Sequence, residues 1–132
     1  LSIGISHEGS WVIRADDAPF PLDNINDFYR AWLLLERPFF DVKRDLDRLA
    51  SAAGATSPFP YWKLVGSAMK ARSLQWTELA MAWVPLLAAA ERTHLRELLL
   101  ETRESRWASQ KVRQLARKYL SQIERMPQSD SS

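Results

Sequence analysis

The sequence contains no cysteine, and only two of its 132 residues are histidine and four are glycine. The lack of cysteine excludes disulfides, thiol catalysis and thiolate metal sites. No glycine-rich phosphate-binding loop and no Gly-x-Ser-x-Gly turn occurs. We therefore predict a protein that is not an enzyme and that has no cofactor and no bound metal.

Two weak candidates for metal or acid–base chemistry remain. Glu91 and His94 have the i, i+3 spacing of some metal sites, but no second pair completes a ligand set. We expect His94 to be a surface residue near Glu97. The acids at positions 16, 17 and 23 lack the calcium-loop pattern and are typical of a solvated turn.

The sequence also lacks a long hydrophobic run. Its longest apolar stretch, Leu79 to Ala90, is interrupted by Pro85 and is shorter than the ~20 residues that span a bilayer. In the first residues, aliphatic side chains alternate with serine and glycine, and there is no basic segment followed by an apolar one. No signal peptide is therefore predicted. We expect no membrane contact and, by default, a cytoplasmic location. The chain begins with Leu1, which fits a processed product or part of a longer chain.

What is present is typical of a globular protein: 46% apolar residues, 26% charged residues and six tryptophans. We predict a mainly α fold, a compact bundle of four to six helices with a short N-terminal β-hairpin. Residues 1–126 are expected to form a single helical domain, with the hairpin in 1–15 and the helices in 24–126. Residues 127–132 are expected to form a flexible tail.

Turn and cap residues indicate where the elements begin and end. Two strands surround the turn at Gly9 and must lie on the helices, since an isolated ribbon is marginal in water. Residues 15–23, with two prolines, are predicted to be a loop. A first helix starts at Asn24, with Asp27 favouring its positive end, and a second runs from Pro38 to Gly54.

The second half of the chain is predicted to be helical throughout. A third helix follows Pro60, and Ser73 caps a fourth that reaches about Arg92 and is kinked or divided by Pro85. Because this fourth helix is apolar on nearly all sides, we expect it to be central. Residues 93–126 contain neither glycine nor proline, so one long helix and two abutting helices both remain possible.

The segment from Arg106 to Arg125 has an apolar stripe and a cationic face. The stripe predicted to be buried comprises Val112, Leu115, Tyr119, Ile123 and Met126. The segment holds six basic residues and one acid, Glu124. Cations beside an aromatic ring are typical of a groove that tracks phosphates and stacks a base. The predicted nucleic-acid-binding residues are Arg106, Trp107, Lys111, Arg113, Arg117, Lys118 and Arg125; the alternative is a solvated face with Trp107 packed against a neighbouring helix.

Aromatic residues crowd the first half of the chain, mostly as a predicted core. Phe39 and Phe40 are adjacent, so in a helix only one of them can enter the same core. We predict Phe40, Phe59 and Tyr61 as partner-binding residues. Residues 49–56 also resemble the first helix and turn of a helix-turn-helix motif, but the next helix would begin with proline and aromatic side chains.

The predicted function is a non-enzymatic accessory subunit that contacts nucleic-acid backbone, without reading sequence, through its basic C-terminal helix. Its partners would be nucleic acid, protein subunits of a larger ribonucleoprotein assembly, or both. The alternative is a protein–protein adaptor, or an inhibitor or immunity-type protein, with no nucleic-acid contact. Residues 1–50 hold six basic and nine acidic side chains, and residues 91–132 hold nine basic and six acidic ones. This polarity is compatible with either function.

Overall fold

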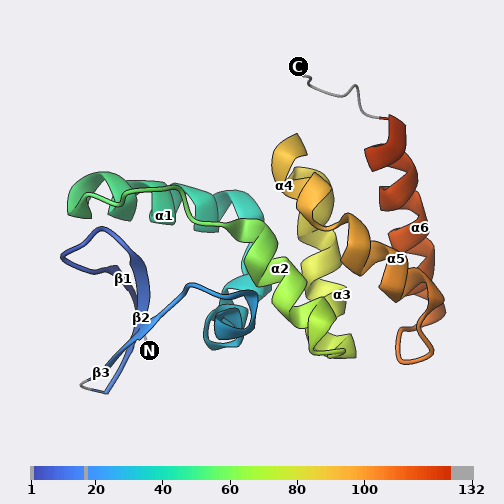
Figure 1. Cartoon of the computed structure of the whole chain (residues 1–132), viewed down its shortest axis with the longest axis horizontal. Helices are drawn as coiled ribbons and strands as arrows, with labels where there is room; N and C mark the ends of the chain where they lie inside the picture. The colour runs from blue at the N-terminus through green and yellow to red at the C-terminus, as the bar shows by residue number, and fades with distance from the viewer. Residues whose placement is uncertain (1, 17, 126–132) are drawn as a thin grey trace.

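The structure is a computed structural model that describes residues 2–16 and 18–125. The predicted mainly α fold is confirmed, because a small antiparallel sheet precedes six α-helices and two 3₁₀ segments in this part of the chain. The sheet and the last helix lie at opposite ends of the longest dimension (Figure 1). The predicted tail at 127–132 falls outside the described residues. The strands are β1 (Ser2–Ile5), β2 (Trp11–Ala15) and β3 (Ala18–Pro21); the helical elements are η1 (Ile25–Glu36), α1 (Phe39–Ala53), α2 (Tyr61–Lys70), α3 (Leu74–Trp83), η2 (Val84–Leu86), α4 (Ala89–His94), α5 (Arg96–Glu104) and α6 (Gln110–Arg125).

The sheet has one strand more than predicted. β1 and β2 form the expected hairpin, with Ile3 opposite Ile13. The predicted loop over residues 15–23 is wrong, because β3 pairs antiparallel with β2 in the order β1-β2-β3. Pro19 and Pro21 are tolerated there because an edge strand needs ladder hydrogen bonds on one side only.

The sheet lies on the helices, as predicted, and is anchored at the loop between α1 and α2. The carbonyl of Gly9 accepts hydrogen bonds from the backbone N–H and the hydroxyl of Thr56, at 2.9 and 3.1 Å. The indole N–H of Trp11 donates to the carbonyl of Ser57 at 3.0 Å. The Trp11 ring also packs edge-on against Phe59, with 5.2 Å between ring centroids. The small sheet is thus stabilised by contacts with the helices.

The helix ends lie at the predicted capping residues. The carboxylate of Asp27 accepts the backbone N–H of Asn24 at 2.9 Å at the start of η1, a twelve-residue 3₁₀ helix. Gly54 ends α1 in the left-handed conformation, with φ of 72°. The hydroxyl of Ser73 accepts the N–H of Trp76 at the start of α3. These boundaries are local in origin and follow from single residues.

Pro85 divides the predicted fourth helix instead of kinking it. α3 ends at Trp83, η2 contains the proline, and α4 starts at Ala89 after an extended residue at Leu87. Of the two possibilities for residues 93–126, separate helices are observed. Among the described helices, none combines the length and apolar character needed to cross a lipid bilayer.

The central helix is α2, and the prediction of the fourth helix as the central one is wrong. Seven of the ten residues of α2 are buried, whereas α3 leaves Leu74, Gln75 and Glu78 exposed. α2 packs against η1, α3, α4 and α5. Because α2 is enclosed in this way, it cannot enter a DNA groove, which excludes the helix-turn-helix interpretation.

The anchor at Gly9 gives a stability prediction. Gly9 and Gly54 both have positive φ, +85° and +72°, but a Cβ on Gly9 would lie 2.5 Å from the Thr56 methyl and 3.0 Å from the Gly54 carbonyl oxygen. A Cβ on Gly54 meets nothing within 4 Å. We expect Gly54→Ala to cost about 1 kcal/mol of unfolding free energy from φ alone, and Gly9→Ala about 2–3 kcal/mol. Urea unfolding measures both, and equal losses would contradict the close contact.

The turn between α2 and α3 stores backbone strain at Arg72. Its φ is 58°, in the left-handed region that favours glycine. Its N–H donates to the Met69 carbonyl and that of Ser73 to Ala68, which is the hydrogen-bond pattern of a glycine-terminated helix. We expect Arg72→Gly to stabilise the fold by about 1 kcal/mol and to raise Tm by roughly 3–5 °C in a thermal melt. The matched Arg72→Ala variant keeps the strain, so it should show no such gain.

Candidate nucleic-acid interface

Helix α6 buries one face and exposes its cations on the other. Its buried residues are Val112, Ala116, Tyr119, Leu120 and Ile123. Compared with the predicted stripe, Leu115 is only half-buried and Ala116 and Leu120 are added, while Met126 lies outside the described residues. The apolar face packs mainly on α5, with smaller contacts to α3 and α4.

The cations of α6 are accessible and unneutralised. Lys111, Arg117, Lys118 and Arg125 are exposed, and Arg113 is half-buried. Over residues 2–16 and 18–125, none of the five forms an ion pair. The only acid of α6, Glu124, contacts Arg96 of α5 at 3.9 Å. The predicted cationic face therefore exists as a surface that can accept a polyanion.

Three of these cations form a row. Lys111, Lys118 and Arg125 are seven residues apart, so they lie on nearly the same side of the helix with about 10.5 Å between neighbours. Arg117 is offset from this row, and Arg113 lies beside the buried face. A regularly spaced row of charge on a straight helix suits contact with an extended phosphate backbone.

Arg106 and Trp107 do not lie on α6, which corrects the predicted helical segment. They lie in the loop that connects α5 to α6. The hydroxyl of Ser109 accepts the N–H of Val112 at 3.2 Å, so α6 begins at Gln110. Arg106 is exposed, whereas Trp107 is half-buried against the core. Ser109, a strong N-cap residue, is the sequence signal that could have placed this boundary.

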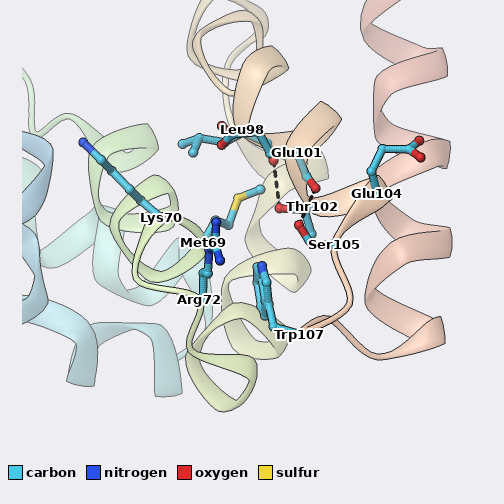
Figure 2. A pocket seen from close by; sticks show the side chains of 9 residues that line it. All are labelled: Met69, Lys70, Arg72, Leu98, Glu101, Thr102, Glu104, Ser105 and Trp107. Carbon is cyan, nitrogen blue, oxygen red and sulfur yellow. Dashed lines mark hydrogen bonds between the residues drawn. The ribbon is translucent and has the colours of Figure 1, made fainter.

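A pocket of about 400 Å³ lies at this loop, and we call it the Trp107 pocket. It is enclosed by the end of α2, by α5 and by the loop before α6 (Figure 2). In Figure 2 the indole of Trp107 extends into the pocket, Arg72 and Met69 lie on the neighbouring wall, and Lys70 and Glu104 point outward. The lining residues are Met69, Lys70, Arg72, Leu98, Glu101, Thr102, Glu104, Ser105 and Trp107.

The polar groups of the Trp107 pocket differ in what they offer a ligand. The hydroxyl of Thr102 donates to the Leu98 carbonyl at 2.7 Å, and that of Ser105 donates to the Glu101 carbonyl, so both protons are already engaged. Glu104 is paired with Arg103 at 2.8 Å. Arg72 is exposed and forms no ion pair within the described part of the chain. The pocket thus presents an aromatic ring and the guanidinium of Arg72, together with the charged side chains of Lys70 and Glu101.

The three predicted partner-binding residues differ in their exposure to solvent. Phe39 is buried and Phe40 is 62% exposed, as the adjacency of the two rings requires. The prediction is wrong for Phe59 and Tyr61, which are 3% and 5% exposed. Both rings belong to an aromatic cluster in the core that also includes Trp11, Phe28, Phe39 and Trp83.

A second cleft, between α1, the start of α2 and α4, contains the predicted Glu91–His94 pair. The carboxylate of Glu91 accepts the backbone N–H of Trp62 at 3.1 Å, in the first turn of α2. The ring of His94 stacks on Trp62, with 4.6 Å between ring centroids. His94 is exposed, as predicted, and within the described residues it forms no hydrogen bond or ion pair with Glu97. The buried hydroxyl of Tyr61 has no hydrogen-bond partner among the described residues, and burial raises the pKa of this phenol.

No group of three or more His, Asp or Glu side chains within residues 2–16 and 18–125 is placed to hold a metal ion. Of the acids considered in the N-terminal turn, Asp17 lies outside the described residues. Glu91 serves as a cap for α2, because it supplies an acceptor to an N–H that has no partner within the helix. The arrangement in the second cleft is therefore explained by helix capping and aromatic stacking.

Glu91 gives a pH-dependent prediction. Burial raises the pKa of its carboxyl above the ordinary 4.5. A raised folded-state pKa means that the contribution of this group to stability is greatest below pH 4.5 and is lost as the pH rises through the raised value. Glu91→Gln keeps an acceptor for Trp62 but cannot ionise. In urea unfolding, wild type should lose stability relative to this variant between pH 4 and pH 7. If the difference in unfolding free energy between the two proteins stayed constant over this range, the raised pKa of Glu91 would be contradicted.

No family model, curated protein or solved structure matches the chain. Its function is therefore inferred from its own residues, above all from the cations of α6 and the side chains of the Trp107 pocket.

Proposed function

We propose that this chain is a non-enzymatic accessory protein that binds nucleic-acid backbone through α6, and that it works within a larger assembly in the cytoplasm. The observation that supports the proposal is the row of Lys111, Lys118 and Arg125, exposed and without ion pairs within the described residues. Arg106, Arg113 and Arg117 add charge beside this row. The backbone N–H groups at the start of α6 add a further positive end near Lys111.

The charge pattern favours backbone contact over sequence reading. Exposed lysine and arginine side chains bind phosphates, and this contact carries no sequence information. α6 packs on α5 and, to a smaller extent, on α3 and α4, so only its outer face is accessible. That face carries long cationic side chains together with Gln114, and such a surface binds with an affinity dominated by the release of counterions.

One observation favours the alternative of a protein–protein adaptor. Phe40, Leu33 and Tyr29 are 62%, 60% and 51% exposed, and large apolar side chains on a surface can serve as contacts for a protein partner. These residues lie on η1 and at the start of α1, away from α6 (Figure 1). The two functions therefore use different surfaces and can be tested separately.

Charge reversal on α6 tests the proposal. We expect Lys111→Glu/Lys118→Glu to weaken binding to mixed-sequence oligonucleotides. Loss of two phosphate contacts should also make the log–log dependence of affinity on salt shallower, by about 1.4 for single strands and about 1.8 for duplex DNA. Fluorescence anisotropy over a salt series measures both quantities.

The matched control is Arg14→Glu/Arg48→Glu, which reverses two exposed cations on β2 and α1 with the same change in net charge. It should retain the wild-type salt dependence. Binding that is absent or independent of salt would contradict the proposal, as would equal weakening in the control. If wild type instead captures a protein partner and Phe40→Ala alone abolishes capture, the adaptor function is supported.

A further inference from the structure

Beyond backbone contact, the Trp107 pocket has the features of a site for one unpaired base. Its volume of about 400 Å³ falls in the range of ~300–1,000 Å³ usual for small-ligand pockets. One wall is the flat indole of Trp107, and Met69 and Leu98 add apolar surface. An aromatic ring in a shallow pocket beside cations is how proteins hold the bases of single strands.

The backbone at Arg72 is the second observation. This residue adopts φ of 58°, where glycine would be unstrained, and its side chain lines the pocket. Strain of this kind is found where a side chain has a role that outweighs its conformational cost. A guanidinium here can lie over the face of a base whose other face rests on Trp107.

The chain links this pocket to the cationic row. Trp107 precedes Lys111 by four residues, so their Cα atoms are separated by at most about 14 Å. Arg106 lies in the same loop and is exposed. The carboxylate of Glu101 would repel a phosphate near the pocket, whereas the carboxylate of Glu104 is paired with Arg103. A nucleic-acid single strand with one base in the pocket can therefore place its neighbouring phosphates on α6.

We propose that this protein binds single-stranded nucleic acid by stacking one base between Trp107 and Arg72, with the adjoining phosphates on Lys111 and Lys118. This inference rests on the proposed function and specifies its substrate class. A paired base cannot reach Trp107, so the pocket contributes nothing to duplex binding. The Thr102 and Ser105 hydroxyl protons are already donated to backbone carbonyls, so these two side chains do not donate to the base.

The test compares oligothymidylate, oligouridylate and duplex DNA, each of about 15 nucleotides per strand. Trp107→Ala should lower affinity for at least one of the two single strands about tenfold or more and leave duplex affinity within about twofold. Trp107→Phe keeps a stacking ring and should retain most of the affinity. An abasic nucleotide series on wild type should reveal one position at which removing the base costs about as much as Trp107→Ala.

Two variants of Arg72 distinguish a binding role of this side chain from a structural one. Arg72→Gly and Arg72→Ala should both weaken single-strand binding severalfold, although only the glycine variant is expected to gain thermal stability. Single-strand affinities unchanged by Trp107→Ala and by both Arg72 variants would overturn the base pocket while leaving salt-dependent binding through α6 intact. Loss of all salt-dependent binding in wild type would instead overturn the proposed function, and the base pocket with it.

Discussion

The fold depends on the enclosure of α2. Four other helical elements pack against this ten-residue helix, and they can do so because its middle is built of small residues, Gly66, Ser67 and Ala68. A Cβ at Gly66 would lie 2.8 Å from the end of the Ile25 side chain and 3.0 Å from that of Leu98, so η1 and α5 meet where this side chain is missing. Helices approach closely only where side chains leave room for them.

The enclosure of α2 divides the molecule into two ends. On one side the aromatic cluster around Phe59 and Tyr61 joins α2 to the sheet and to α1. On the other side α5 covers α2 and carries α6, whose outer face is cationic. The exposed apolar residues Leu33 and Phe40 lie on η1 and α1, and Figure 1 shows both elements apart from α6. The exposed apolar side chains and the cations of α6 thus belong to different elements.

The break between α5 and α6 creates the candidate site. A continuous helix would carry Trp107 along with the cations, whereas the loop turns the indole back toward the end of α2. There it lines the pocket together with Arg72, a residue from a different part of the chain that is held in a strained conformation. The pocket therefore combines a local event, the cap at Ser109, with a tertiary contact between α2 and the loop.

Features that depend on neighbouring residues could be predicted from the sequence. The caps at Asn24, Gly54 and Ser73 are of this kind, and so is the apolar face of α6. The exposure of one of the rings Phe39 and Phe40 also follows from their adjacency.

Features that depend on distant residues could not be predicted in this way. The burial of Phe59 and Tyr61 requires rings from the sheet, η1, α1 and α3. The position of Arg72 beside Trp107 requires the packing of α2 against α5. Hydrogen bonds along the backbone are decided within a few residues, but burial is decided by whichever distant surfaces exclude water together.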